Sequence, residues 1–453
     1  RPMIEAAQAH YLSGARFFET AQKRKGGPFR TSRGSSVRFR SDSQIGFDEC
    51  GALCTIATGN PVMTPSSSSS HVERGMLREL AWLFLRLGGT SFGGPAAHIA
   101  MMEEEVVHRR AWLSRQEFLD LLSATNLIPG PSSTELAIHI GHRRAGWPGL
   151  LVAGVCFIVP AVLIVTVLAW IYVRFGTLPA AARILLGIKP VIIAIVLQAL
   201  WGLGRTALKS LSLIVVGILS LGVTLLGVHE LLVLLGAGLL MVVVHAIRSP
   251  TGTDSTASAL LLFASPAALH STLTPLAVGA TPFGLCSLLL FFLKVGSVLF
   301  GSGYVLLAFL RADLVERFHW LTEAQLLDAI AVGQFTPGPV FTTATFIGFL
   351  LNGMTGALVA TIGIFLPAFV FVAISSPLIP LLRSSRLASA MLDGVNVASL
   401  ALMLATTCHL GRSAISGGWT LGLTILSLLV LIRLQTNSAW LVLGGALLGL
   451  LCS

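Results

Sequence analysis

Charged residues are scarce in this 453-residue chain. Asp, Glu, Lys and Arg together make up 11% of it, whereas apolar residues make up 54%. The mean hydropathy of +0.83 lies outside the range of soluble globular proteins. No charged side chain occurs in Leu150–Val173 or in Ala329–Leu382, and apolar runs of about 20 residues are long enough to cross a bilayer as helices. The composition therefore excludes a soluble domain and predicts an all-α polytopic protein of the lipid bilayer.

Signatures of ATP-driven pumps and of common enzymes are also missing. The string nearest to a phosphate-binding loop, Gly204–Ser210, lacks the required glycine spacing. No Gly-x-Ser-x-Gly elbow and no zincin-type histidine pair is present. The six cysteines are scattered, and Cys50 and Cys54 have no second pair or nearby histidine to complete a metal site. The sequence predicts no cofactor, no metal and no enzymatic activity, which leaves a secondary transporter or a channel.

The net charge of +10 comes mostly from the N-terminal end. The first 40 residues hold nine Lys or Arg against two acidic residues, and Ser-rich sequence follows to the Ser66–Ser70 run. Such a stretch is typical of a disordered tail or of an organelle targeting segment. We assign residues 1–74 to this leader and expect no nucleic-acid partner. A multi-pass location in the plasma membrane is expected, with an organelle membrane left open.

The rest of the chain is an internal duplication. Residues 84–131 return at 292–339 with an offset of 208, and beyond this element the offset is 207. Matches of Gly, Pro and Trp in order over such a length indicate two homologous halves. We divide the chain after the leader into a first repeat at 75–247, a linker at 248–286 that is a candidate for an extra crossing, and a second repeat at 287–453. Pairs that define the alignment include Trp112/Trp320, Asp120/Asp328, Gly141/Gly348, Gly146/Gly353, Gly149/Gly356 and Pro160/Pro367.

Each half is expected to contain a first helix broken at a Gly cluster, an amphipathic loop with a Trp, a hairpin centred on Pro-Gly-Pro, and three or more further spans. The matched regions Val106–Lys189 and Asp313–Asn396 hold eight and three Lys or Arg, respectively. Because basic loops stay on the cytoplasmic side, this difference favours opposite orientations, and so an inverted repeat. In all, about ten to thirteen transmembrane segments with broken or re-entrant helices are predicted.

The Gly clusters and the Pro-Gly-Pro turns are the predicted substrate site. Where a helix breaks inside the membrane, its freed backbone groups need partners, and the N-terminus of the next helix presents donors and a partial positive charge. Two such ends per half, pointing inward, would hold an oxyanion near the midplane. Packing kinks are the alternative, since Gly and Pro are common in membrane helices. The residues are Gly93, Gly94, Pro95, Pro129, Gly130, Pro131 and Ser132 in the first half and Gly301, Ser302, Gly303, Pro337, Gly338 and Pro339 in the second.

Polar residues near these motifs add candidates. Arg86 and its counterpart Lys294 lie within an apolar segment, where a cation is costly; they are predicted to neutralise a dianion, with snorkelling to a surface as the alternative. Asn126 and its counterpart Gln334 precede the turns and are predicted amide donors.

A coupling site is predicted in the first half only. Glu135 aligns with Thr343, and His139 follows it by one helical turn, so the two side chains are positioned to share a proton. Structural capping by Glu135 is the alternative. The coupling ion is left open, with a proton as the candidate.

These residues together resemble the chromate ion transporter family in its long, two-domain form. The resemblance covers about 75–453, and it implies a membrane carrier that exports chromate from the cytoplasm, confers resistance to chromate and is driven by the membrane's ion gradient. It depends on Phe92-Gly93-Gly94-Pro95, Trp112-Leu113, Glu117-Phe118, Asn126–Pro131, the glycines 141, 146 and 149, Phe300–Tyr304 and Gly333–Pro339.

Other functions stay open at this point. A carrier of sulfate or another tetrahedral oxyanion fits the same scaffold. A membrane-embedded reductase is disfavoured, because no Cys cluster, flavin motif or haem-ligand pattern is present. A non-transporting assembly or channel protein would use the Gly and Pro motifs as hinges. The oligomeric state is open as well, with a homodimer as one assembly.

Overall fold

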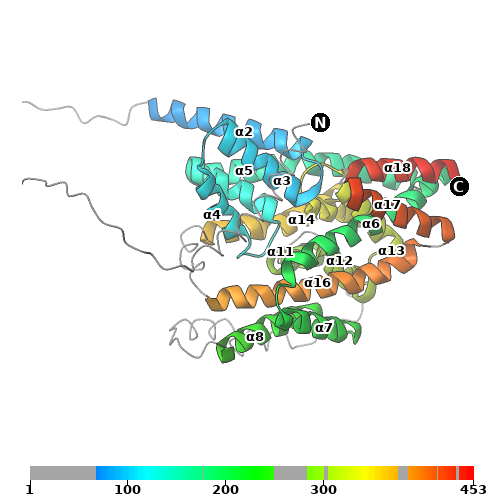
Figure 1. Cartoon of the computed structure of the whole chain (residues 1–453). Coiled ribbons are helices and arrows are strands. Elements are labelled where there is room, and N and C mark those ends of the chain that lie inside the picture. Colours follow the sequence, from blue (N-terminus) through cyan, green and yellow to red (C-terminus); the bar gives the residue numbers. More distant parts are fainter. Residues whose placement is uncertain are drawn as a thin grey trace, which may run out of the picture. The chain divides into compact units, whose positions relative to one another are not determined.

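The computed structural model describes residues 68–176, 178–248, 283–299, 305–375, 386–415, 417–434 and 438–452, and every element in these ranges is a helix (Figure 1). Most of the leader, the linker from 249 to 282, the Gly301-Ser302-Gly303 cluster and the Cys50/Cys54 pair lie outside the described residues. The predictions made for these segments therefore stay predictions.

The two halves have the same order of elements, as the duplication predicts. The first contains α2 (Ser68–Thr90), α3 (Gly94–Glu103), the π-helix η1 (Glu104–Arg109), α4 (Arg115–Thr125), α5 (Ser132–Phe175), α6 (Pro179–Ala207), α7 (Leu211–Leu225) and α8 (Glu230–Arg248). The second contains α11 (Leu285–Val298), α12 (Leu306–Leu310), the π-helix η2 (Arg311–Arg317), α13 (Glu323–Phe335), the 3-10 turn η3 (Val340–Thr342), α14 (Thr343–Ser375), α16 (Arg386–Ala414), α17 (Gly418–Leu434) and α18 (Ser438–Cys452).

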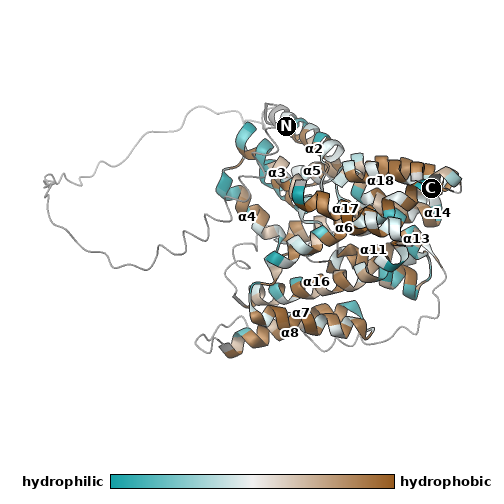
Figure 2. Ribbon diagram, turned by 45° about the vertical axis from the view of Figure 1, so that its right-hand side comes forward, coloured by the Kyte–Doolittle hydropathy of each residue, from teal (hydrophilic) through white to brown (hydrophobic). Residues whose placement is uncertain are grey.

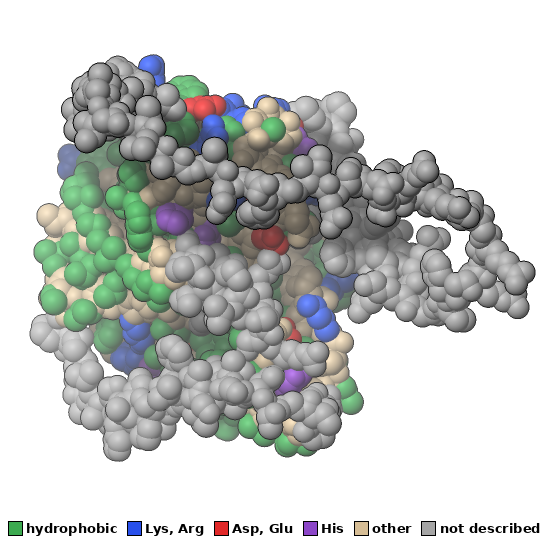
Figure 3. Space-filling model, turned by 90° about the vertical axis from the view of Figure 1, so that its left-hand side faces the viewer, with side chains coloured by type: hydrophobic (Ala, Val, Ile, Leu, Met, Phe, Trp, Pro, Cys, Tyr) green, Lys and Arg blue, Asp and Glu red, His purple; other side chains and the backbone are tan. Residues whose placement is uncertain are grey.

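The described helices are those of an integral, multi-pass membrane protein. Five of them are long and apolar enough to cross a bilayer (α5, α6, α8, α14 and α16), and α7, α11, α17 and α18 are shorter apolar helices. Leu163 on α5 and Ile362 on α14 are more than half exposed, as lipid-facing side chains are. Figure 2 shows hydrophobic residues along the outer helices, and Figure 3 shows a broad apolar surface on one face. The number of crossings and the inverted orientation stay predictions.

The longest helices, α5 and α14, are each two helices joined by a sharp turn. The turns lie at Ala145-Gly146 and Asn352-Gly353, and both glycines have a positive φ, 59° and 57°, which favours glycine at these positions. Gly141 packs on the backbone of Gly149, and Gly348 packs on Gly356 in the same way, so a Cβ at any of the four would overlap a carbonyl oxygen. The predicted hairpins therefore form because glycine lets the two limbs touch.

The repeats exchange helices with each other. Helix α6 of the first repeat packs against α17 and α18 of the second, α16 of the second packs against α7 and α8 of the first, and α5 packs against α14. Gly187 lies against Gly445 and Gly449, and the equivalent Gly394 lies against Gly238. Gly445 and Gly449 are thus packing glycines, as the sequence indicated. This exchange joins the described helices of the two repeats into one compact unit.

The predicted amphipathic loops, which contain Trp112 and Trp320, each begin with a π-helix. Helices α3 and α12 continue into π-helices, and the chain then reverses at Ala111 and His319, both with a positive φ. A capping box at Ser114 and Glu117 starts α4, and an equivalent box at Thr322 starts α13. The bonds from Ser114 hold the pKa of Glu117 below its usual value.

Candidate functional site

Helix breaks occur where the first Gly cluster and the two Pro-Gly-Pro turns predicted them. Helix α2 ends at Thr90, Gly93 caps α3 with a φ of 109°, and Pro95 lies in the first turn of α3. Gly130 and Gly338, at the centres of the two turns, have φ values of 142° and 90°. Because these positive φ angles strain other residues, glycine is needed for each break.

Two equivalent hydrogen bonds join each turn to the helix break of the other repeat. The Gly130 N–H donates to the carbonyl oxygen of Leu299 over 2.8 Å, and the Gly338 N–H donates to that of Ser91 over 3.0 Å. Ser91 and Leu299 are equivalent positions, as are Gly130 and Gly338. A carbonyl freed where one helix ends is thus satisfied by a turn from the other half. The breaks therefore meet at the interface between the repeats, which is where carriers built from repeats bind substrate.

A buried histidine joins the first break to the first turn. The Nε2 atom of His98, on α3, lies 3.1 Å from the Ser91 carbonyl oxygen, and its Nδ1 lies 3.3 Å from Ser133 Oγ at the start of α5. The ring is 1% exposed and packs edge-on against Phe157. Since a carbonyl only accepts, Nε2 carries the proton in this arrangement. Sequence reasoning missed His98 and Ser91; the signal was their replacement by Leu306 and Leu299 in the second repeat.

Glu135 and His139 are both buried. Within the described part of the chain, the two carboxylate oxygens of Glu135 and the Nε2 atom of His139 have no hydrogen-bond partner. Helix α5 has no side-chain cap, which gives the capping role of Glu135 no support. The carboxylate lies over Gly130, where a Cβ would collide with it. In the second repeat the equivalent Thr343 donates to the Val340 carbonyl oxygen over 2.8 Å.

The two predicted amide donors are placed differently. Asn126 ends α4 and is exposed, whereas Gln334 lies near the end of α13 and is buried. Its Nε2 has no hydrogen-bond partner among the described residues, and the same holds for the hydroxyl of Thr336. Only the second-repeat amide is therefore available inside the protein.

Arg86 and Lys294 are already paired with carboxylates. An Nη atom of Arg86 lies 2.6 Å from Glu105 Oε1, and Lys294 Nζ lies 2.9 Å from Asp313 Oδ2. The carboxylates belong to the π-helices η1 and η2, occupy equivalent positions and are nearly fully buried. An anion would have to compete with a buried carboxylate for either cation. The sequence did not predict these pairs.

A polar contact also links the repeats away from the turns. Asp328 on α13 is buried, accepts a hydrogen bond from the Tyr172 hydroxyl over 2.8 Å and lies 3.2 Å from Lys189 Nζ. Tyr172 and Lys189 belong to the first repeat. Sequence analysis used Asp328 only as an alignment marker, because an ion pair between distant segments has no local signal.

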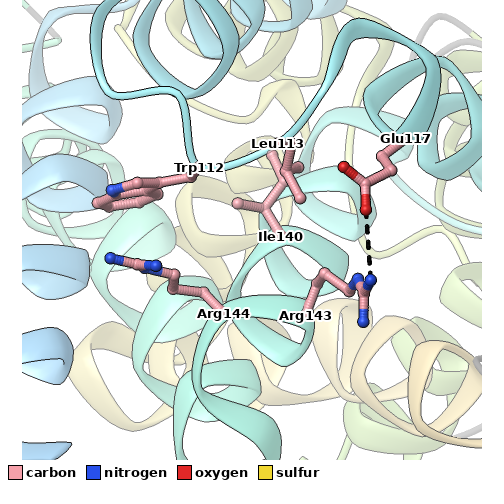
Figure 4. Close-up of a pocket in the computed structure, with 6 residues that line it drawn as sticks. All are labelled: Trp112, Leu113, Glu117, Ile140, Arg143 and Arg144. Atoms are coloured by element: carbon pink, nitrogen blue, oxygen red, sulfur yellow. Dashed lines mark hydrogen bonds and ion pairs between the residues drawn. The ribbon is translucent and has the colours of Figure 1, made fainter.

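A small cavity of about 140 Å³ lies at the turn of the first hairpin. Figure 4 shows the Trp112 ring beside Arg144, with Arg143 pointing to Glu117 on the other side. The Arg144 guanidinium lies 4.9 Å from the ring centroid, and Arg143 pairs with Glu117 over 3.3 Å. These contacts use both cations, so the cavity is better explained by anchoring of the hairpin than by binding of the substrate.

Comparison with known proteins agrees with this architecture. A sequence model of the family described as "Chromate transporter" matches residues 78–242 and again 286–450. The "Chromate transport protein" of Cupriavidus metallidurans is 31% identical over 398 residues, which cover 86% of this chain and 96% of the relative. The "Probable chromate transport protein" of Synechococcus elongatus is 31% identical over 78% of this chain and 89% of the relative. No solved structure matches.

The "Chromate transport protein" of Pseudomonas aeruginosa is also 31% identical, over 73% of this chain and 80% of the relative. The double match fits the two repeats, and the names of these relatives point to transport rather than enzymatic conversion. With helices broken at the interface of two exchanged repeats, the chain belongs to the chromate transporter family.

Proposed function

We propose that this protein is a secondary active transporter that exports chromate from the cytoplasm and thereby confers resistance to chromate. The observation that carries the proposal is the pair of reciprocal bonds, Gly130 to Leu299 and Gly338 to Ser91, which join each turn to a helix end of the other repeat at the interface between the repeats. Rocking of one repeat against the other would expose this interface alternately to each side. The plasma membrane is the expected location, and an organelle membrane would suit the same mechanism.

The proposed substrate site lies at the N-terminal ends of two helices. Gly94 and Pro95 lie in the first turn of α3, and α5 begins directly after Pro129-Gly130-Pro131; the partial positive charge of each helix end favours an anion. Next to the second turn, the side-chain amide of Gln334 is an additional donor, whereas the one N–H group of Pro337-Gly338-Pro339, that of Gly338, is already bonded to Ser91. The predicted role of Arg86 and Lys294 requires that they leave their carboxylates.

Glu135 is the proposed coupling group, with a proton as the coupling ion and His139 as its neighbour. An ionised carboxylate over Gly130 repels a dianion, whereas the protonated acid can donate a hydrogen bond to it. Proton and anion are then bound together. A cycle that moves a dianion with one proton carries one net negative charge outward, and an inside-negative potential contributes roughly 2.3 kcal/mol per 100 mV to it.

The test is chromate flux in proteoliposomes that contain the full chain, with an imposed potential and a pH difference. We expect saturable flux that responds to the potential, and loss of its pH dependence in Glu135→Gln. Glu104→Gln, at an exposed carboxylate paired with Arg109, is the matched control and should transport like the parent. Flux that is passive and unsaturated would reject the carrier and favour the channel alternative.

Sulfate is the competitor that defines the substrate class. Chromate and sulfate are both tetrahedral dianions, and backbone N–H groups do not distinguish them by charge. Equal competition would extend the proposed function to tetrahedral oxyanions in general, whereas a clear preference for chromate would restrict it.

A further inference from the structure

The two Pro-Gly-Pro turns have equivalent backbones but different side chains around them. In the first repeat, the helix break and the turn carry Ser91, His98, Ser133, Thr134 and Glu135, which we call the first-repeat polar cluster. All five are buried. The equivalent positions in the second repeat are occupied by Leu299, Leu306, Phe341, Thr342 and Thr343.

The side chains around the two turns also differ in their hydrogen bonding. In the described part of the chain, the hydroxyls of Ser91 and Thr134 and the carboxylate of Glu135 have no partner. Thr342, the counterpart of Thr134, donates to the Pro339 carbonyl oxygen over 2.8 Å. A buried hydroxyl without a partner is costly, so these groups need a partner that the described residues do not supply, such as water or a bound anion. The first turn offers such groups next to the start of a long helix, whereas the two threonines that follow the second turn, Thr342 and Thr343, both donate to nearby carbonyl oxygens.

Apolar residues close the second turn to an anion. Phe341 takes the position of Ser133 and is 2% exposed, and Leu306 takes the position of His98 and is fully buried. The unpartnered groups on this side, Gln334 and Thr336, come just before Gly338, whose N–H is bonded to Ser91. They belong to the segment that meets the first-repeat polar cluster.

We propose that each chain binds one oxyanion, and that the first-repeat polar cluster is its site. Thr134 supplies a hydroxyl donor at the positive N-terminal end of α5, and Glu135 supplies the proton that accompanies the anion; the Ser133 hydroxyl donates to Nδ1 of His98. His98 is a positioning residue: its bond to the Ser91 carbonyl holds the ring against Ser133. The second turn holds the repeats together. This inference rests on the proposed function and specifies the site of that carrier.

Thr134→Val and Thr342→Val are the decisive pair, because both remove one hydroxyl at equivalent positions with little change of shape. Chromate binding to the full-length protein in detergent is measured by equilibrium dialysis, together with the melting temperature. We expect one chromate per chain in the parent. Thr134→Val should weaken binding roughly ten- to hundredfold, the loss of one hydrogen bond to a charged group, without lowering the melting temperature. Thr342→Val should change affinity by less than about twofold.

His98 is tested by replacement and partial rescue. His98→Leu copies the second repeat and should weaken binding, while His98→Gln, which can still donate to Ser91, should retain more affinity at a similar melting temperature. Equal affinity of these two variants would remove the positioning role.

Other outcomes overturn the inference. Two chromates per chain, or equal losses in the two threonine variants, would reject a single first-repeat site and leave the carrier itself intact. A parent that neither binds nor transports chromate, in a preparation with a cooperative melting transition, would reject the proposed function and this inference with it.

Discussion

Replacing Lys294 by Ala is expected to destabilise the protein more than replacing its counterpart Arg86. Lys294 is one of two cations on Asp313, whose side chain is 1% exposed, so its removal leaves Arg317 alone. Arg86 is one of three cations on Glu105, and two arginines remain after its removal. After loss of the equivalent cation, the buried carboxylate therefore keeps one cationic partner in the second repeat and two in the first.

The expected cost follows from burial. A hydrogen bond to a charged group contributes about 1.5–3 kcal/mol. Solvent screens part of this pair, because the Lys294 side chain is 33% exposed. We expect a loss of about 1–2 kcal/mol for Lys294→Ala and less than about 1 kcal/mol for Arg86→Ala. The double variant Lys294→Ala/Asp313→Asn should regain stability, since no buried charge is then left short of a partner.

The assay combines the melting temperature with chromate flux per folded protein. If Lys294 acts mainly through Asp313, flux and melting temperature fall together in Lys294→Ala and recover together in the double variant. This is the result we expect. Recovery of the melting temperature without recovery of flux would refute this reasoning and show that Lys294 contacts the anion itself.

Three further predictions concern the scaffold. Gly141→Ala should lower the yield of folded protein, because its Cβ would overlap the carbonyl oxygen of Gly149. The control is Gly222→Ala on α7, where a Cβ meets nothing within 4 Å, so the yield should stay unchanged or rise. Equal yields of the two variants would contradict the hairpin contact. Gly130→Ala should abolish chromate flux, because the φ of Gly130 is +142° and the added Cβ would meet the Glu135 carboxylate. Pro131→Ala should retain more flux than Gly130→Ala. Equal residual flux in the two variants would mean that both residues serve packing alone. Ser114→Ala removes the cap of α4 and should cost about 1 kcal/mol, seen as a lower melting temperature with unchanged flux at permissive temperature.

Helix breaks and packing contacts were predictable because they depend on local chemistry. The glycines and prolines that break a helix or begin the next one can be recognised in the sequence, and the duplication shows each motif twice. The breaks before Gly94 and Ser132 and the packing role of Gly445 followed from such signals. The exchange of α6 and α16 between the repeats did not, because it depends on which apolar faces fit together in three dimensions.

The polar contacts were less predictable for a related reason. Arg86 reads from the sequence as a lone cation in an apolar segment, yet its partner Glu105 comes 19 residues later on a π-helix. No sequence signal separates a π-helix from an α-helix. The sequence therefore could not predict that the Glu105 side chain points toward Arg86. The partnership of Lys189 with Asp328 spans the two repeats and gave no signal for the same reason.

What the repeats share and what they do not share carry different information. The hairpin turns at Gly146 and Gly353 and the carboxylates of the π-helices occur in both halves, so they are what any copy needs to fold and to dock onto the other. If one binding site lies at the interface between the repeats, only one repeat has to supply its polar groups. The other repeat can then have apolar residues that pack at the equivalent positions. Leu306 occupies the position equivalent to His98, and Phe341 the position equivalent to Ser133, as this expectation requires. In a duplicated chain, the motifs found in both copies therefore include those that the scaffold needs, and buried polar residues without a polar counterpart show where the chemistry specific to one copy is to be sought.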